Sequence, residues 1–291
     1  MTVVAFALST VGGTVGSPVG SSPASVVGRA ARLGITAVAL DGSLDAAALE
    51  VLIPAILGAG VAVVAVEAPC PRPTGGRPPR LASDDREERL AATRAFEATV
   101  TTAARVGASR VVVQLGVLEV QHAWPRTVRA FAEQSLDDDE RERLVKIRRT
   151  LSPHALDLAR FALDAILWHA ADAGVTIGLV NRARWFEIAS AAEVDALLGE
   201  FRGAPLATFY DAAAAHVRAA LGLGSGRPAI ELEAASGAFL SDAAGLRGGL
   251  PWGTGEIDHA HVLAKLPEAS PRILRSAIAT DEEILTAMAG L

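Results

Sequence analysis

Several features are scarce in this chain, and each scarcity excludes a class of protein. Cys70 is the single cysteine among 291 residues, so the chain forms no internal disulfide and no cysteine-based metal cluster. Basic residues are in deficit, since 27 Lys and Arg against 33 Asp and Glu give a formal net charge of -6. Because binding to nucleic acid needs clustered Lys and Arg, we expect no nucleic-acid partner.

Long apolar runs and targeting signals are missing as well. The chain has no uninterrupted apolar run of about 18 residues, the length that a transmembrane helix needs, so we expect no membrane partner. The first residues, Met1 to Leu8, lack the basic region and the length of a signal peptide. Together with the lone cysteine, these absences predict a cytoplasmic protein.

What is present is a repeating pattern of strand and helix. Hydrophobic residues make up 51% of the chain, which is enough for a large core. Continuous apolar runs alternate with amphipathic segments, several of which stop at a glycine: Gly34, Gly60 and Gly107. This alternation is typical of a parallel sheet covered by helices. The predicted strands span residues 3–8, 36–40, 61–66, 110–114, 175–180, 206–210, 237–241 and 272–274.

Eight such units favour a closed (β/α)8 barrel over an open doubly wound sheet, with residues 1–291 as a single domain. One segment, at about 117–152, breaks the rhythm and predicts a helical insertion after the fourth strand. Its charged run at 137–149 (DDDERERLVKIRR) is typical of a solvated helix face, which makes a polar surface helix the simpler interpretation. The alternative is a lid or a dimer arm, because the insertion follows the carboxyl end of a strand.

Six segments carry a resemblance to a known family. They are LGITAVAL, AVEAPCPRP, RVGASRVVVQLG, GVTIGLVNR, TFYDAAAAHV and GLPWGTGEID. In this order and spacing they resemble the xylose-isomerase-like TIM barrels of the sugar phosphate isomerase and epimerase family, nearly from end to end. The resemblance implies a divalent-metal site made by a Glu after strand five, an Asp after strand six, a His on strand seven and a Glu on strand eight. It also implies that the two Glu residues transfer protons.

Compared position by position, most of that metal site is absent. Where the family has metal ligands or residues of its strand motifs, this chain has Val180, Ala214, Phe239 and Arg275. Asp211 alone remains of this set, and Asp242, at the end of the stretch Phe239-Leu240-Ser241-Asp242, is a displaced carboxylate. A metal needs about three or four converging donors, which two carboxylates do not supply. We therefore expect a divergent member with no metal and no other cofactor.

The residue that ends each strand of such a barrel faces the site. The candidates at the mouth are Asp41, Glu67, Gln114, Asn181, Asp211, Asp242 and Arg275. Carboxylates gathered there without a counter-charge cost on the order of several kcal/mol each. Arg275 is placed to neutralise them by pairing with Asp211, Asp242 or Glu67. It is either a structural plug or a ligand-binding arginine, and the residues leave both open.

The sequence thus predicts two groups of site residues. Asp211, Glu67 and His216 are the candidate acids and bases, and the candidate ligand-binding residues are Arg275, Asp242, Asn181, Gln114 and Trp252. For His216 the alternative is a helix-surface position, and Trp252 either walls the pocket or covers the barrel rim.

Three functions fit these residues. The first is an isomerase, epimerase or lyase that works without metal on a small polar or anionic, sugar-like ligand, with Arg275 holding an anionic or enolate oxygen. The second is a non-catalytic pseudoenzyme that binds a ligand or a partner, either a second copy of itself or an active paralogue. The third is an ordinary metal-dependent sugar isomerase or epimerase whose ligands lie elsewhere.

Overall fold

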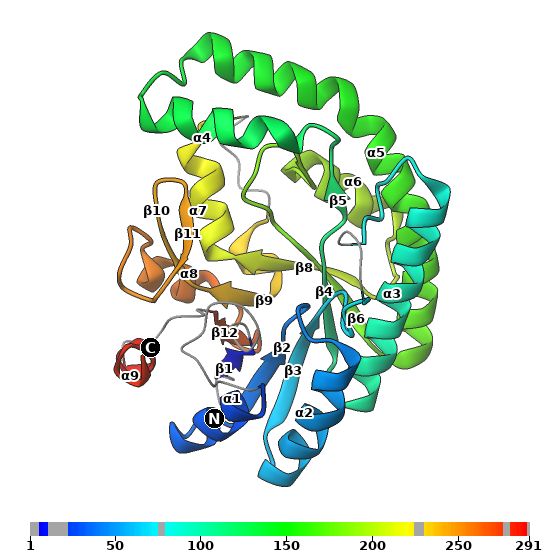
Figure 1. The fold of residues 1–291 in the computed structure, drawn as a ribbon, viewed down its shortest axis with the longest axis vertical. Helices are drawn as coiled ribbons and strands as arrows, with labels where there is room; N and C mark the ends of the chain where they lie inside the picture. The colour runs from blue at the N-terminus through cyan, green and yellow to red at the C-terminus, as the bar shows by residue number, and fades with distance from the viewer. Residues whose placement is uncertain (1–5, 11–22, 75–78, 224–229, 276–279, 290–291) are drawn as a thin grey trace.

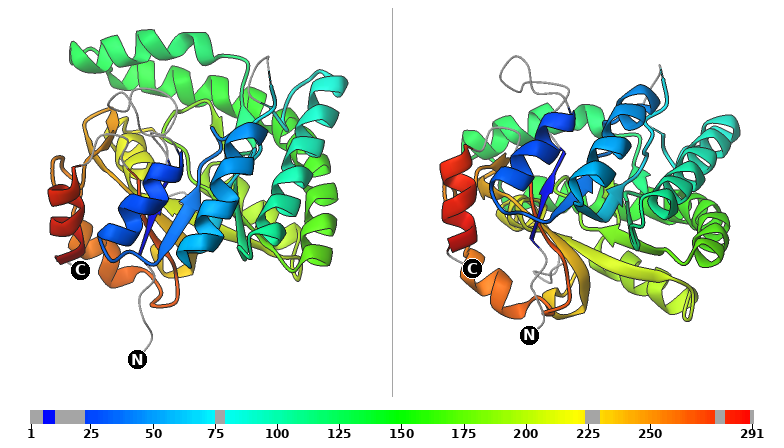
Figure 2. Two further views of the ribbon diagram at one scale, coloured as in Figure 1. Left: turned by 60° about the horizontal axis from the view of Figure 1, so that its bottom comes forward. Right: turned by 90° about the horizontal axis from the view of Figure 1, so that it is seen from below.

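The computed structural model describes residues 6–10, 23–74, 79–223, 230–275 and 280–289. Eight parallel strands close into a barrel in the order β1-β12-β9-β8-β6-β4-β3-β2, with helices outside them (Figures 1 and 2). The predicted single (β/α)8 TIM barrel is therefore confirmed. Of the first predicted strand, residues 3–5 lie outside the described residues.

The barrel strands are β1 (Phe6–Ser9), β2 (Ala37–Leu40), β3 (Ala62–Glu67), β4 (Arg110–Val113), β6 (Thr176–Val180), β8 (Leu206–Asp211), β9 (Ala235–Leu240) and β12 (Arg272–Leu274). Two short antiparallel pairs stand outside the barrel: β5 (Gly116–Val117) with β7 (Glu187–Ile188), and β10 (Asp242–Ala244) with β11 (Arg247–Leu250). The helices are α1 (Pro23–Arg32), α2 (Ala46–Ala59), α3 (Arg86–Arg105), α4 (Trp124–Ala132), α5 (Asp138–Ala173), α6 (Ala191–Glu200), α7 (Ala212–Ala220), α8 (His259–Lys265) and α9 (Asp281–Ala289).

Local sequence signals set many of these boundaries. Gly34, Gly60 and Gly107 have φ of 71°, 66° and 72°, the left-handed conformation in which glycine ends a helix without steric cost. Ser190 and Glu193 form the predicted capping box at the start of α6. Each of these signals is short-range, which is why the sequence alone places them.

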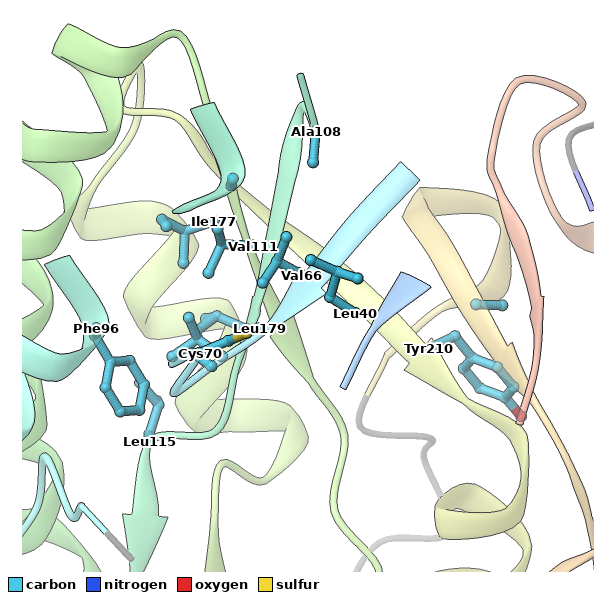
Figure 3. Packing of buried hydrophobic residues seen from close by; sticks show 14 of the residues in the cluster. Leu40, Val66, Cys70, Phe96, Ala108, Val111, Leu115, Ile177, Leu179 and Tyr210 are labelled. Carbon is cyan, nitrogen blue, oxygen red and sulfur yellow. The ribbon is translucent and has the colours of Figure 1, made fainter. Parts of the chain in front are cut away.

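The inside of the barrel is packed unevenly. Its buried side chains are small on one side (Ala7, Ala37, Ala39 and Ala65) and large on the other, where the rings of Phe209 and Phe239 lie 4.9 Å apart. The second apolar cluster lies between the strands and the outer helices. Figure 3 shows part of it, with Phe96 of α3 turned toward Leu115 and Cys70 close to Leu179.

The insertion after β4 continues into a barrel helix. It holds α4 and the first part of α5. This helix is 36 residues long in all, runs through Pro153 and becomes the barrel helix that precedes β6. No glycine separates the two parts, and a proline within a long helix can bend it without ending it. In Figure 1, α4 and the beginning of α5 lie across one end of the barrel, next to α7.

A search of the described helices finds none that is both long enough and apolar enough to cross a bilayer.

The close approach of Phe209 to a neighbouring strand generates the first prediction. A Cβ at Gly237 would lie 2.4 Å from Cε2 of Phe209, so Gly237→Ala should lower the free energy of unfolding by about 1 to 3 kcal/mol through overpacking. The measurement is denaturant unfolding. Gly58→Ala, in α2, is the control, because a Cβ there meets no atom within 4 Å and should be neutral or stabilising. Equal stability of the Gly237 variant and the parent would contradict the packing described here.

Candidate active site at the barrel mouth

A ring of polar side chains caps the apolar interior of the barrel. Because side chains alternate along a strand, the residue two positions beyond each interior residue faces the same way. These positions hold Ser9, Asp41, Glu67, Gln114, Arg182, Asp211, Ser241 and Arg275. Every member is polar or charged. The inward-facing side chains therefore change from apolar to polar within two residues along each strand.

Arg275 lies among three carboxylates of this ring. Its Nη2 donates to Oε2 of Glu67 at 2.9 Å and lies 3.6 Å from Oδ2 of Asp41, and its Nη1 lies 3.7 Å from Oδ2 of Asp211. The guanidinium carbon lies 4.6 Å from the ring centroid of Phe239, on which the side chain rests. Burial alone would lower the pKa of Arg275, but the surrounding carboxylates raise it, so the arginine stays charged.

Glu67 is the carboxyl whose titration is most displaced. Its burial, followed by the nearby charge of Asp41 and a hydrogen bond to it, outweighs the attraction of Arg275 and raises the pKa of Glu67 from 4.5 to about 7. Gln114 donates to its Oε1 at 3.1 Å. A carboxyl that titrates near neutrality both accepts and releases protons, which is the property of a general acid or base.

Asp211 is fixed in place from both sides. Its backbone N–H donates to Oδ1 of Asn181 at 2.6 Å, and its carbonyl accepts from Nδ2 of Asn181 at 2.9 Å. Its Oδ1 accepts from the backbone N–H of Ala214 and so caps α7, which leaves Oδ2 facing Arg275. Asn181 therefore acts on the position of Asp211 through the backbone.

A pocket of about 430 Å³ opens at this end of the barrel. Its walls include four residues of the polar ring, Arg182, Asp211, Ser241 and Arg275, together with Trp124. The β10–β11 hairpin and the first turn of α7 complete the walls. The volume falls within the range of small-molecule sites, about 300 to 1,000 Å³.

The structure brings together some of the predicted site residues. Glu67, Gln114, Asp211 and Arg275 meet at the mouth, and Asn181 lies behind Asp211. Asp242 is turned away, because its two carboxylate oxygens accept backbone N–H groups of Ala243, Gly255 and Ile257, whose effect outweighs burial and lowers the pKa of this group. Asp242 thus holds the hairpin that walls the pocket.

Two further predicted residues lie beside the pocket walls, not among them. Trp252 stacks on His259 with ring centroids 3.7 Å apart. His216, on α7, has its Nε2 3.1 Å from Oε2 of Glu256. Their assignments as ligand-binding and acid/base residues stay predictions, and neither residue contacts Arg275 or Glu67.

Sequence reasoning missed Arg182, Glu187 and Trp124, all of which line the pocket. Arg182 pairs with Glu187 at 2.7 Å. The strand alternation that begins at the buried Val180 would have placed Arg182 in the ring. No local signal points to Glu187 or Trp124, because β7 and α4 reach the mouth from segments outside the barrel strands.

The residues present do not fit the divalent metal that the resemblance implies. Val180 and Phe239 belong to the apolar interior, and the Arg275 guanidinium lies within 4 Å of all three ring carboxylates, where it would repel a cation. Within the described residues, no three His, Cys, Asp or Glu side chains gather as metal ligands. The lack of a metal remains a prediction for the protein in solution.

The only cysteine takes no part in this chemistry. Cys70 is fully buried, and this burial, followed by the negative charges of Asp41 and Glu67, raises the pKa of its thiol to about 12. A thiol in this state is a poor nucleophile.

Comparison with known proteins finds solved structures of similar fold but assigns the chain to no family. No family model and no curated protein matches the chain. Among solved structures it is similar to the 3-keto-D-glucoside 4-epimerase YcjR from E. coli, with a TM-score of 0.65, 14% identity and coverage of 99% of this chain and 98% of that chain. It is also similar to a D-psicose 3-epimerase (TM-score 0.65, 12% identity, 98% and 97% coverage).

A third similar structure is the xylose isomerase domain protein from Planctomyces limnophilus, with a TM-score of 0.57, 13% identity and coverage of 98% and 94%. The xylose-isomerase-like barrel fold is therefore confirmed, and two of these three neighbours are sugar epimerases by name. At such identities the likeness concerns the fold, and the residues of the mouth must be considered by themselves.

The displaced pKa of Glu67 predicts a dependence of stability on pH. The folded state binds this proton more tightly than the unfolded chain between pH 4.5 and about 7, so the contribution is full below 4.5 and is lost as the pH rises through 7. We expect the parent to lose roughly 3 kcal/mol more than Glu67→Gln over this interval. Denaturant unfolding at several pH values measures it, and parallel profiles for the two proteins would show that Glu67 is not the displaced group.

Arg275 generates a second stability prediction. Removing the guanidinium leaves partly buried carboxylates without a counter-charge, so Arg275→Ala should lower the free energy of unfolding by about 2 to 4 kcal/mol at neutral pH. The loss should shrink in acid, where Glu67 is protonated. The control is Arg202→Ala, which removes an exposed arginine from the segment before β8. If both alanine variants melt like the parent, the charge of Arg275 does not support the mouth.

Proposed function

We propose that this chain is a metal-independent, sugar-isomerase/epimerase-like enzyme that transfers protons on a small polyhydroxy ligand. The observation that supports it most directly is the placement of Asp211 and Arg275 on one pocket wall, with Nη1 and Oδ2 3.7 Å apart. This separation exceeds a hydrogen bond, so both groups retain capacity to bind ligand atoms. A carboxylate beside a guanidinium provides a base and a partner for a developing negative charge.

The proposed chemistry begins with a proton on a carbon next to a ligand carbonyl. Asp211 accepts this proton through Oδ2, the electrons of the C–H bond move toward the carbonyl, and Arg275 stabilises the resulting enolate oxygen. Return of the proton to the former carbonyl carbon gives isomerisation when the hydroxyl proton on the deprotonated carbon passes to the oxygen that Arg275 holds, which leaves a new carbonyl at the deprotonated carbon. Delivery to the opposite face of the original carbon gives epimerisation and needs a second acid.

We assign Glu67 one of two roles: it supplies that second proton, or its protonation state adjusts the effect of Arg275 on the ligand. It contacts Arg275 directly, and its pKa of about 7 means that both protonation states are populated at neutral pH. When Glu67 is protonated, Arg275 is no longer neutralised by it and acts more strongly on a ligand oxygen. A rise in rate with falling pH through about 7 would follow from this role.

The composition of the walls favours a sugar-like ligand. The walls carry the carboxylate of Asp211, the guanidiniums of Arg182 and Arg275 and the hydroxyl of Ser241. A sugar hydroxyl both donates and accepts, so it matches acceptors and donors that lie side by side. Solved neighbours named for sugars, a 3-keto-D-glucoside and D-psicose, agree with this choice.

A second candidate has its own observation. The 2.9 Å ion pair of Arg275 with Glu67 also fits a structural plug that stabilises a mouth without chemistry. In that case the chain is a non-catalytic binding protein, and its further partner is a second copy of itself or an active paralogue. Ligand binding without proton exchange is the signature of this candidate.

The test is exchange of ligand protons with solvent. Ketoses and aldoses are incubated with the protein in D2O with a chelator, and loss of the proton next to the carbonyl is followed by NMR. We expect exchange that persists with the chelator and is lost by at least about a hundredfold in Asp211→Asn, the lower end of a general-base contribution. Asparagine retains the α7 cap, so this variant separates the lost base from a lost fold.

Asp172→Asn is the matched control, because Asp172 is exposed near the end of α5. Exchange that the chelator abolishes would favour the metal-dependent alternative. Binding of a sugar with no exchange in the parent would favour the non-catalytic candidate.

A further inference from the structure

The pocket has a cationic group that the chemistry proposed above does not use. Three arginines line it: Arg182, Arg184 and Arg275. Arg182 is paired with Glu187 at 2.7 Å and Arg275 with Glu67 at 2.9 Å. For Arg184, in contrast, no carboxylate of the described residues lies within ion-pair distance of the guanidinium, which instead lies 5.7 Å from the ring centroid of Trp124.

The backbone of Arg184 is held firmly although its charge is unpaired. Its N–H donates to Oε2 of Glu187 at 2.7 Å. Its carbonyl accepts from the backbone N–H of Glu187 at 3.1 Å and from Nη1 of Arg218 at 2.9 Å. These bonds fix where the side chain begins, and Trp124 of the insertion supports its far end.

Glu187 does not compensate this charge. One of its carboxylate oxygens binds Arg182 and the other binds the backbone N–H of Arg184, so neither is directed to the Arg184 guanidinium. Glu187 is also 3% exposed, which keeps it away from a ligand. The unpaired guanidinium is therefore available from the pocket.

We propose that Arg184 binds an anionic group of the ligand, a carboxylate or a phosphate, so that the pocket selects sugar acids or sugar phosphates over neutral sugars. This inference rests on the proposed function for the identity of the sugar, with the reacting carbonyl at Asp211 and Arg275. Arg184 belongs to the loop after β6 and contacts α4, so the anionic group lies toward the insertion and away from the reacting atoms. Guanidinium groups bind both anions in a two-pronged geometry.

The experiment measures dissociation constants by calorimetry for D-fructose, D-fructuronate and D-fructose 6-phosphate, which share one carbon skeleton. We expect at least one charged ligand to bind about tenfold more tightly than fructose, which is the effect of one hydrogen bond to a charged group. Which of the two anions binds better identifies the carboxylate or the phosphate as the natural group. Arg184→Gln should abolish the preference, so that the charged ligands bind this variant no more tightly than fructose does.

Arg202→Gln is the control, because it removes an exposed arginine at the amino end of β8, away from the mouth. Thermal unfolding of both variants checks that they are folded. In the parent the preference should also weaken as salt is added, since an exposed charge is screened. Inorganic phosphate should compete with the charged ligands and should not compete in Arg184→Gln.

Equal affinity for the three ligands, no binding of either anion, or an anion preference that survives in Arg184→Gln would overturn the inference. These results are distinct from a failure of the proposed function. Anion binding through Arg184 without exchange of ligand protons in D2O would contradict the enzyme and leave the anion site standing. Exchange of ligand protons in D2O together with equal affinity for the three ligands would contradict the anion site and leave the enzyme standing.

Discussion

One guanidinium lies among three carboxylates at the mouth of the barrel, and the arrangement of the site depends on this contact. Arg275 holds Glu67 and Asp41 near each other although their charges repel, and it lies close to Asp211 on the pocket wall. The apolar surface of Phe239 supports the guanidinium from below. The interior of the barrel and the charge balance of its mouth are therefore coupled through a single side chain.

Burial raises the pKa of Glu67, and the contact with Arg275 offsets this rise only in part. Arg275 is one cation for three acids, so it does not hold all of them ionised, and the most buried carboxyl retains its proton up to about neutral pH. A dedicated ion pair with one acid would have lowered that pKa. A site that shares its positive charge among several acids keeps one proton available, which is what acid/base chemistry requires.

Much of the fold could be read from the sequence, because strand periodicity, capping residues and helix-ending glycines are local signals. Arg275, Glu67, Gln114 and Asp211 could be assigned to the mouth for the same reason, since each ends or follows a barrel strand. Asn181 and Asp242 each lie one residue away from an inward-facing position of the polar ring. Because side chains alternate along a strand, both are turned away from the mouth and bond to backbone groups.

Other features needed three-dimensional contacts. The hydrogen bonds of Asp242 come from residues up to 15 positions away in a hairpin and loop with no marked strand pattern. Trp124 reaches Arg184 across 60 residues of sequence, which no periodicity predicts. The continuity of α5 depends on the tolerance of a helix for Pro153, and composition alone favours an interruption there.

The burial of Cys70 has a practical consequence for how this molecule can be studied. Burial raises the pKa of this thiol to about 12, so the thiolate is scarce at neutral pH, and the sulfur is shielded from solvent as well. The natural chain is in effect a protein without a reactive thiol. One cysteine introduced on the insertion and one on the β10–β11 hairpin would be the groups that accept fluorescent or spin labels, so the distance between these two walls could be followed in an otherwise unaltered protein.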